Sequence, residues 1–407
     1  MALIVKKFGG SSVRDPERLY HVASIITDTY KEGNDVVVVL SAQGDTTDHL
    51  IKMAEEINPN ASRREMDMLL STGEQISIAL CAMAIEKLGF PVISLTGWQV
   101  NLRTDSNYGS ARIKKLAGER IRAELHKRNI VIVAGFQGIN KFGDVTTLGR
   151  GGSDTTAVAL AAELGADLCQ IYTDVDGVYT ADPRIVPNAK KLDEITFDEM
   201  LELASLGAQV LQNRSVELAK RYGVHLEVLS SLEHKPGTIV KEVTTRMEKT
   251  LISGVAKDDN VASVSLIGLQ DVPGVAYKIF SVLAKNRINV DIILQSIGRE
   301  STKDITFTVA KENLSQVIKI LKDKQNVLMF KDMTTSEKLS KVSIVGAGMI
   351  NNPGIASQMF EALYSVGVNI QMISTSEIKV SVLIDKSEAD IALKAVHDKF
   401  FSPRSDH

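Results

Sequence analysis

A short glycine-rich segment, residues 148–154, constrains the fold of this chain most strongly. It reads Leu-Gly-Arg-Gly-Gly-Ser-Asp and follows an apolar run at 130–136. A run of helix-forming residues comes after it, so the order predicts a strand, a glycine turn and a helix capped by Ser153 or Asp154. Free N–H groups at such a helix start suit a phosphate or a carboxylate, and Arg150 adds a planar donor for either anion. Ordinary loop packing is the alternative for this segment taken alone.

The first 240 residues repeat the same alternation of apolar runs and helical patterns. The run at 35–40 is β-branched and continuous, which is typical of a strand buried on both faces. Strands alternating with helices indicate a parallel sheet, in which ligands bind beyond the carboxyl ends of the strands. Polar loops follow the expected strands, so we expect these loops to line one edge of the sheet.

The sequence after about residue 240 contains an internal repeat. Pro273-Gly274 and Pro353-Gly354 are 80 residues apart, and each begins a helix within a βαββα pattern. The first copy has a candidate closing strand at 327–331, whereas the second copy ends without one. We therefore expect the unused strand 251–256 to complete the second copy and to join the two copies into one unit.

Composition excludes several classes of function. The chain has 407 residues, of which 44% are apolar and 24% charged, as in an ordinary protein of two or three domains. A net charge of −3 gives no basic surface for nucleic acid. We find no signal peptide and no run that would span a bilayer, and we expect no membrane partner. Cys81 and Cys169 lack partner motifs and are expected to be buried thiols in a reducing, cytoplasmic compartment.

Three groups along the expected edge suggest phosphate chemistry. Lys7 ends the first strand beside Gly9-Gly10, where an ammonium could meet transferring phosphoryl oxygens while glycine N–H groups hold phosphates. Asp154 could orient that lysine. The alternatives are a lysine in solvent and a simple helix cap. Carboxylates in the loop 173–184 suggest Mg²⁺ or nucleotide binding, with a plain surface loop as the alternative.

Other motifs narrow the chemistry further. Glu74 interrupts an apolar helical region and could bind a substrate ammonium, although a capping or solvated glutamate has the same pattern. There is no Walker-type Gly-Lys-Ser/Thr motif, and Gly346-Ala347-Gly348 lacks the third glycine of a dinucleotide fingerprint. The histidines have no metal-ligand spacing, so we expect no protein-only metal site.

Four of these motifs together resemble one family. Lys7–Ser12, Ser71–Glu74, Leu148–Asp154 and Tyr172–Arg184 occur in the combination and order seen in aspartokinases. Ser374–Val380 resembles the end of that family's regulatory region. The resemblance spans nearly the whole chain and implies an α/β fold, with a mostly parallel sheet of the amino acid kinase type sandwiched by helices. Two ferredoxin-like βαββαβ ACT modules are expected to follow it.

The resemblance also implies domain boundaries. The catalytic domain is expected at 1–242, the first ACT module at 251–335 and the second at 336–407, with strand 251–256 completing the second. The reaction implied is transfer of a phosphoryl group from ATP, with Mg²⁺, to L-aspartate. It opens the pathway to lysine, threonine, methionine and diaminopimelate.

Site residues are carried over from the family motif by motif. Lys7 would stabilise the transferring phosphoryl group, Asp154 would organise the lysines around it, and Arg150 would clamp the α-carboxylate of aspartate. Glu74 would face the substrate ammonium. The remaining substrate-binding residues are Ser41, Thr47 and Ser153. The nucleotide-binding residues are Lys7, Phe8, Gly9, Gly10, Thr173, Asp174, Tyr179, Asp182, Arg184 and Lys235.

The resemblance of the repeat to ACT modules implies regulation by a small amino acid. Lysine, threonine or both would inhibit by shifting the enzyme between two states, and the modules would join chains into a homo-oligomer. The effector-binding residues are Asp271, Asn289, Val290, Asp291 and Gln295 in the first copy and Ile355, Ala356, Asn369 and Ile370 in the second. A dimerisation scaffold without ligand is the alternative. An internal start at Met247 would give a shorter companion chain.

Two departures and several rivals remain open. Gln43-Gly44-Asp45 replaces a loop that more often carries methionine with lysine or threonine, and Gln212-Asn213 stands where relatives often have His-Pro. Rival readings are a kinase of the same fold acting on acetylglutamate, glutamate or a nucleoside monophosphate, and an amino-acid sensor that has lost catalysis. Arg150 with Glu74 favours a substrate with a free α-amino group.

Overall fold

The chain forms two compact units. The computed structural model describes residues 2–206, 210–233, 235–244, 251–296, 302–349 and 352–402. The first unit comprises Met1–Tyr179, Lys190–Ser205 and Gln209–Arg246. The second unit comprises Thr180–Ala189, Leu206–Ala208 and Met247–His407, so a short segment from the middle of the chain belongs to it.

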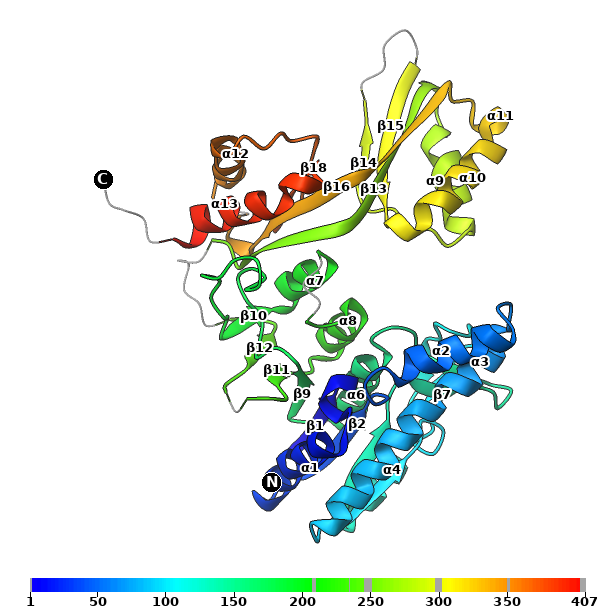
Figure 1. The fold of residues 1–407 in the computed structure, drawn as a ribbon, viewed down its shortest axis with the longest axis vertical. Coiled ribbons are helices and arrows are strands. Elements are labelled where there is room, and N and C mark those ends of the chain that lie inside the picture. Colours follow the sequence, from blue (N-terminus) through cyan, green and yellow to red (C-terminus); the bar gives the residue numbers. More distant parts are fainter. Residues whose placement is uncertain are drawn as a thin grey trace. The chain divides into compact units, whose positions relative to one another are not determined.

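An eight-stranded sheet forms the centre of the first unit (Figure 1). Its order is β10-β12-β11-β9-β1-β2-β6-β3, and all neighbours are parallel except β11 and β12. The strands are β1 (Leu3–Phe8), β2 (Asp35–Leu40), β3 (Val92–Leu95), β6 (Ile130–Ala134), β9 (Leu168–Thr173), β10 (Glu194–Thr196), β11 (Leu226–Ser230) and β12 (Thr238–Lys241). Residues 36–40 of β2 have no exposed surface, which confirms the prediction of a strand buried on both faces.

Helices cover both faces of this sheet. Successive side chains of β1 point to opposite faces, so neighbouring residues of this strand contact different helices. Phe8 is buried in a core with Val22 of α1 and Ile78 of α4, whereas Lys7 faces α6. The helices are α1 (Pro16–Lys31), α2 (Thr46–Ile57), α3 (Arg63–Leu70), α4 (Thr72–Lys87), α5 (Glu119–His126), α6 (Gly152–Leu164), α7 (Phe197–Ser205) and α8 (Asn213–Tyr222). The predicted sandwich of helices around a mostly parallel sheet is confirmed.

Three smaller observations complete the first unit. A four-stranded sheet has the order β5 (Ile113–Lys115), β4 (Arg103–Thr104), β7 (Gln137–Ile139) and β8 (Val145–Thr147). Cys81 and Cys169 are buried free thiols, as predicted. Within the described residues, only Arg63–Lys87 has the length and apolar composition of a membrane span, with 44% of its most apolar window buried; buried core helices pass the same test.

Two long antiparallel strands, β13 and β16, run through both copies of the repeat in the second unit (Figure 1). The six-stranded sheet has the order β14-β15-β13-β16-β18-β17. Residues 254–258 of β13 pair with 341–345 of β16 beside the second copy, and residues 263–267 pair with 332–336 beside the first. The strands are β13 (Gly254–Gln270), β14 (Ile293–Gln295), β15 (Thr302–Val309), β16 (Asp332–Val345), β17 (Met372–Thr375) and β18 (Lys379–Asp385).

The closing strand expected at 327–331 is wrong. Residues 325–328 form the short helix α11, which ends where Met329 adopts a left-handed conformation with φ 58°. Leu328 and Phe330 are both buried, and this alternate spacing imitated a strand. The strand that closes the first copy is instead the polar first half of β16, which carries no apolar pattern.

Each copy has its own core. The first copy packs α9 (Val275–Lys285) and α10 (Leu314–Asp323) on its strands, and the second packs α12 (Ile355–Ser365) and α13 (Ala389–Phe401). Segment 180–189 joins the second core through Ala181 and Val186. Thr180 also lies 2.9 Å from Nε2 of the buried His397, which anchors the segment on α13.

Candidate active site

The carboxyl end of β1 carries a close ion pair. Lys7 Nζ lies 2.6 Å from Asp154 Oδ1, and the two side chains are only 12% and 9% exposed. Asp154 stands in the first turn of α6, where backbone N–H groups point outward and favour negative charge. The pair therefore combines a fixed positive charge with a helix N-terminus, an arrangement suited to a phosphate.

Glycines keep the backbone open beside this pair. A Cβ atom on Gly10 would lie 2.6 Å from the carbonyl oxygen of Ala42, so only glycine allows the two loops to approach. Ser41 N–H donates to Phe8 O, and Gly44 N–H donates to Gly10 O, which ties the loop after β2 to the loop after β1. A cavity of about 160 Å³ lies beside the Lys7–Asp154 pair. It is lined by Lys7, Gly9, Ser11, Asp154, Ile171, Tyr172, Thr173, Asp174, Val210, Leu211 and Gln212.

Glu74 is a buried carboxylate at the start of α4. Its Oε1 accepts a hydrogen bond from Ala42 N–H at 3.2 Å, whereas its Oε2 is buried and has no hydrogen-bond partner among the described residues. Burial raises the pKa of Glu74 to about 8, against the lowering effect of backbone hydrogen bonds. A buried oxygen without a donor is suited to a cationic ligand.

Arg150 occupies an exposed turn between two glycines that both adopt left-handed conformations, Gly149 and Gly151. Ser153 is buried against Gly135, where a Cβ atom would come within 2.6 Å of the serine hydroxyl oxygen. Ser41 and Thr47 are half-buried in the loop that follows β2 and in the start of α2. These expected substrate residues thus come from loops at the same edge of the sheet.

The expected nucleotide residues fall into three places. Thr173 and Asp174 line the Lys7 cavity, where the threonine hydroxyl donates to the Asp174 carboxylate at 2.9 Å. Tyr179 donates instead to Asp176 at 2.7 Å. Asp182 and Arg184 pair with each other at 2.8 Å and belong to the second unit.

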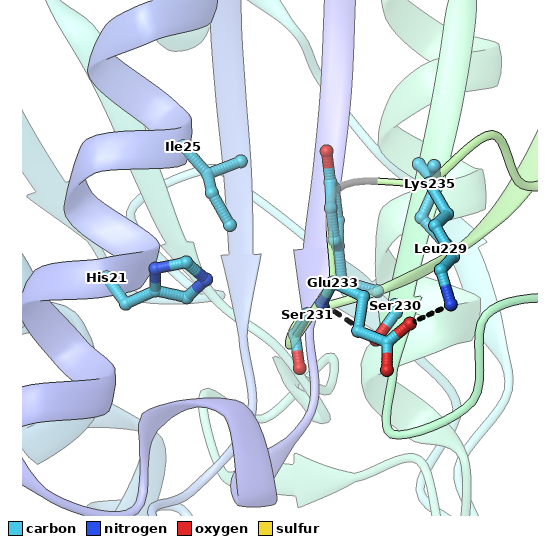
Figure 2. Close-up of a pocket in the computed structure, with 8 residues that line it drawn as sticks. His21, Ile25, Leu229, Ser230, Ser231, Glu233 and Lys235 are labelled. Carbon is cyan, nitrogen blue, oxygen red and sulfur yellow. Dashed lines mark hydrogen bonds and ion pairs between the residues drawn. The ribbon is translucent and has the colours of Figure 1, made fainter.

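A second cavity lies at the carboxyl ends of β9 and β11, and Figure 2 shows the side chains that line it. Its volume is about 180 Å³, and Lys235 on its wall pairs with Glu233 at 2.5 Å. Its lining residues are His21, Ile25, Tyr172, Leu229, Ser230, Ser231, Glu233 and Lys235. Tyr172, which begins the Tyr172–Arg184 motif but was not among the predicted site residues, lines both cavities and stacks on Phe8 with ring centres 4.5 Å apart. Its position at the end of an expected strand was the available signal.

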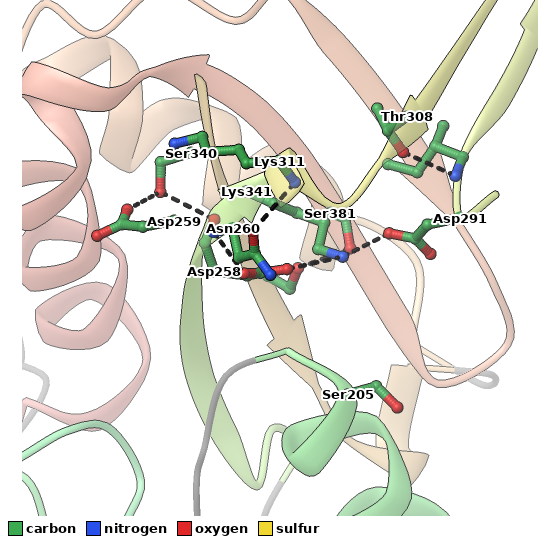
Figure 3. A network of polar contacts seen from close by, with 12 residues as sticks. Ser205, Asp258, Asp259, Asn260, Asp291, Thr308, Lys311, Ser340, Lys341 and Ser381 are labelled. Atoms are coloured by element: carbon green, nitrogen blue, oxygen red, sulfur yellow. Dashed lines mark hydrogen bonds and ion pairs between the residues drawn. The ribbon is translucent and has the colours of Figure 1, made fainter. Parts of the chain in front are cut away.

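The effector positions of the first copy include two ion pairs. Lys303 Nζ lies 3.0 Å from Asp271, and Lys341 Nζ lies 2.5 Å from Asp291 (Figure 3). Val290 packs against the first core, whereas Asn289 and Gln295 are exposed. In the second copy Ile355 is buried, Ala356 and Ile370 pack on the second core, and Asn369 is exposed. Met247 lies outside the described residues.

The described residues contain no group of three or more His, Cys, Asp or Glu side chains arranged to hold a metal ion. Proteins usually hold Mg²⁺ through one or two carboxylates together with substrate phosphates. Asp174 in the Lys7 cavity fits that smaller requirement.

Comparison with known proteins places this geometry in a family. Residues 2–230 match the Amino acid kinase family, and residues 264–325 and 342–400 match the ACT domain. The chain is 50% identical to the aspartokinase of Bacillus sp. (strain MGA3) over 98% of its own length and 97% of the relative.

Two solved structures are similar over almost the whole chain. E. coli aspartokinase III in complex with aspartate and ADP (R-state) has a TM-score of 0.84 at 26% identity, covering 98% of this chain and 100% of that one. The same enzyme in complex with lysine and aspartate (T-state) has a TM-score of 0.76 at 26% identity, with the same coverage. The chain therefore belongs to the aspartokinase family, and is a phosphotransferase that carries ACT domains.

Proposed function

We propose that this kinase transfers the γ-phosphoryl group of ATP to the β-carboxylate of L-aspartate, giving 4-phospho-L-aspartate and ADP. The observation that carries the proposal is the Lys7–Asp154 pair in a glycine-edged cavity that also contains Thr173 and Asp174. A relative of the same fold is described in complex with aspartate and ADP, which supports both the acceptor and the donor. The product would enter the pathway to lysine, threonine, methionine and diaminopimelate, in the cytoplasm.

The proposed chemistry needs charge stabilisation and positioning. An oxygen of the β-carboxylate forms a bond to the γ-phosphorus while the bond from that phosphorus to the β–γ bridging oxygen breaks, and ADP leaves. The carboxylate is already ionised at neutral pH, so no general base is required. Lys7 stabilises the charge on the transferring oxygens, and Asp154 holds the lysine in place.

Substrate and nucleotide are held by different loops in this proposal. Arg150 binds the α-carboxylate of aspartate, and Glu74 binds its ammonium through the oxygen that has no donor among the described residues. Ser41, Thr47 and Ser153 complete the substrate site. The N–H groups of Gly9 and Gly10 hold phosphates, and the remaining nucleotide-binding residues of the proposal are Phe8, Thr173, Asp174, Tyr179 and Lys235. Mg²⁺ bound with the nucleotide would add charge neutralisation, with Asp174 as its carboxylate. A nucleotide role for Asp182 and Arg184 stays a prediction.

We further propose that lysine, threonine or both bind the ACT modules and inhibit the enzyme. The relative described with lysine and aspartate supports an amino-acid effector. The expected effector positions include Asp291, a half-exposed carboxylate able to bind an ammonium. Homo-oligomers through the ACT modules, with or without a shorter chain begun at Met247, are part of the same proposal.

The proposal is tested by ADP release from the purified chain with aspartate, glutamate, N-acetylglutamate or a nucleoside monophosphate as acceptor. We expect release with aspartate and little with the other three. Recognition of a free α-amino acid by Arg150 and Glu74 disfavours N-acetylglutamate and the nucleoside monophosphate, and the relative described in complex with aspartate and ADP favours aspartate over glutamate. Added lysine and threonine, alone and together, test the effector assignment. Faster release with any other acceptor than with aspartate would contradict the proposal.

A further inference from the structure

Asp67 on α3 is a fully buried carboxylate that collects donors from two separate segments. It accepts hydrogen bonds from Gly109 N–H at 2.9 and 3.0 Å and from Thr147 N–H at 2.9 Å. The Thr147 hydroxyl donates a further bond at 2.7 Å. Asp67 makes no ion pair within the described residues, so its charge is balanced by these donors.

Arg214 on α8 donates hydrogen bonds to the same two segments from which Asp67 accepts them. Its Nη1 donates to Leu148 O at 3.0 Å and its Nη2 donates to Ala111 O at 2.9 Å. The planar guanidinium therefore bridges two carbonyl groups that belong to different stretches of chain. An anion holds the N–H groups, and a cation holds the carbonyl groups.

The two segments also contact each other directly. Ala111 N–H donates to Thr147 O at 2.8 Å, and a Cβ atom on Gly149 would lie 3.2 Å from Gly109 O. Residues 109–111 thus lie alongside residues 147–149. Asp67 and Arg214 each form hydrogen bonds to both segments and so hold the two segments together. The next residue along the chain is Arg150.

Arg150 follows residues 147–149 directly along the chain. Its side chain is exposed, and no ion pair or hydrogen bond holds it within the described part of the chain. Its backbone stands between two glycines with φ 81° and 67°, a conformation that side-chain-bearing residues rarely adopt. The position of the Arg150 Cα–Cβ bond, and so the region that its guanidinium can reach, is therefore set by the backbone that leads into the turn.

We propose that Asp67 and Arg214 are positioning residues that fix the Arg150 turn for binding the substrate carboxylate. The proposal rests on the proposed role of Arg150 as the clamp on aspartate. Neither residue lines the Lys7 cavity, so their effect reaches the substrate through the backbone of residues 147–149 and not through the nucleotide.

The test compares Michaelis constants in the full-length chain. Asp67→Asn turns one acceptor into a donor that faces an N–H group, and Arg214→Lys can reach only one of the two carbonyls. We expect the KM for aspartate to rise by about tenfold or more in each variant, since small misplacements of a binding group are costly. The KM for ATP should stay near that of the wild type.

Matched controls lie on the same two helices. Glu65→Gln on α3 and Arg221→Lys on α8 alter side chains that are 62% and 64% exposed, and neither should change the KM for aspartate. Thermal melting confirms that each variant is folded. If Asp67→Asn does not fold, the KM values of Arg214→Lys for aspartate and for ATP test the proposal instead.

The outcomes separate this proposal from the proposed function. If the wild type does not phosphorylate aspartate, both fall. If it does, and the KM for aspartate is unchanged in the folded variants or rises together with the KM for ATP, only the positioning role is overturned. A selective rise in the KM for aspartate supports it.

Discussion

Each unit contains a lysine that has little exposed surface and is paired with an aspartate, and the surroundings of the two pairs differ. Lys7 and Asp154 lie 2.6 Å apart in the first unit, with 12% and 9% of their side chains exposed. Lys341 and Asp291 lie 2.5 Å apart in the second unit, where the lysine is 7% exposed but the aspartate 48%. The chemical pair is the same in both places.

The surroundings separate the two roles. The Lys7 pair lines a cavity bordered by glycine, so a ligand can reach both charges. The Lys341 pair lies among packed strands (Figure 3): Lys341 is on β16, 3.6 Å from Asp258 of β13, and Asp291 stands just before β14. Ile292 is buried in a cluster with residues of β16 and β18. The first pair is therefore placed to act on a ligand, whereas the second links an expected effector loop of the first copy to the strands of the second.

Removing the first lysine should have the largest effect. Lys7→Met deletes the charge expected to stabilise the transferring phosphoryl group, so kcat should fall by about 10²- to 10³-fold or more. Lys31→Met, which breaks a surface pair with Asp28, is the control and should leave kcat unchanged. Comparable kcat values for the two variants would remove the catalytic side of the comparison.

A pH profile sharpens the comparison at the first site. Glu74 has its pKa raised to about 8 by burial, and its protonated form cannot pair with a substrate ammonium. Below that pH the KM for aspartate should therefore rise, by up to about tenfold per pH unit for one titrating group. Glu74→Gln should raise the KM and flatten this profile. A wild-type KM that is constant between pH 6 and 9 would contradict the assignment.

The same group affects stability with a definite sign. Because the folded state binds the Glu74 proton more tightly than the unfolded chain, this residue's contribution to stability falls as the pH rises from the ordinary glutamate range through about 8. Glu74→Gln should remove that loss, which thermal melting across the pH range would show.

Removing Lys341 should have the smallest effect, and this effect should be on inhibition and not on kcat. Lys341→Met should leave kcat without effector near the wild-type value, because the pair is part of the second unit. Inhibition by lysine or threonine should weaken by about 2- to 30-fold, the range expected for residues that carry coupling between sites. Lys399→Met, which removes a surface ion pair with Glu361, is the control. A lower basal kcat with unaltered inhibition would reverse the roles assigned to the two pairs.

Local patterns were sufficient to predict the elements that build the catalytic edge. The β-branched run of β2 and the glycine turn before α6 each specify their own structure. Lys7 ends the apolar run of the neighbouring strand β1, and Asp154 stands in the first turn of α6. The parallel sheet followed from strands alternating with helices, and the kinase fold from the family resemblance. The position of the site followed because parallel strands bring their carboxyl ends to one edge.

Long-range packing could not be predicted in the same way. Asp67 is bonded to residues 42 and 80 positions away, and within α3 it looks like any solvated helix carboxylate. The closing half of β16 is polar, so its pairing with β13 left no periodic signal. Segment 180–189 likewise joins the second core through only a few apolar side chains, spread along a turn-rich loop.

Trapping of the product tests the central claim most directly. Hydroxylamine converts an acyl phosphate to a hydroxamate, so the wild type and Lys7→Met can be incubated side by side with ATP, aspartate and hydroxylamine. The account predicts aspartyl hydroxamate formed in step with ADP by the wild type, and almost none by the variant. ADP without hydroxamate in the wild type, or equal hydroxamate from both proteins, would contradict phosphoryl transfer to aspartate at the Lys7 cavity.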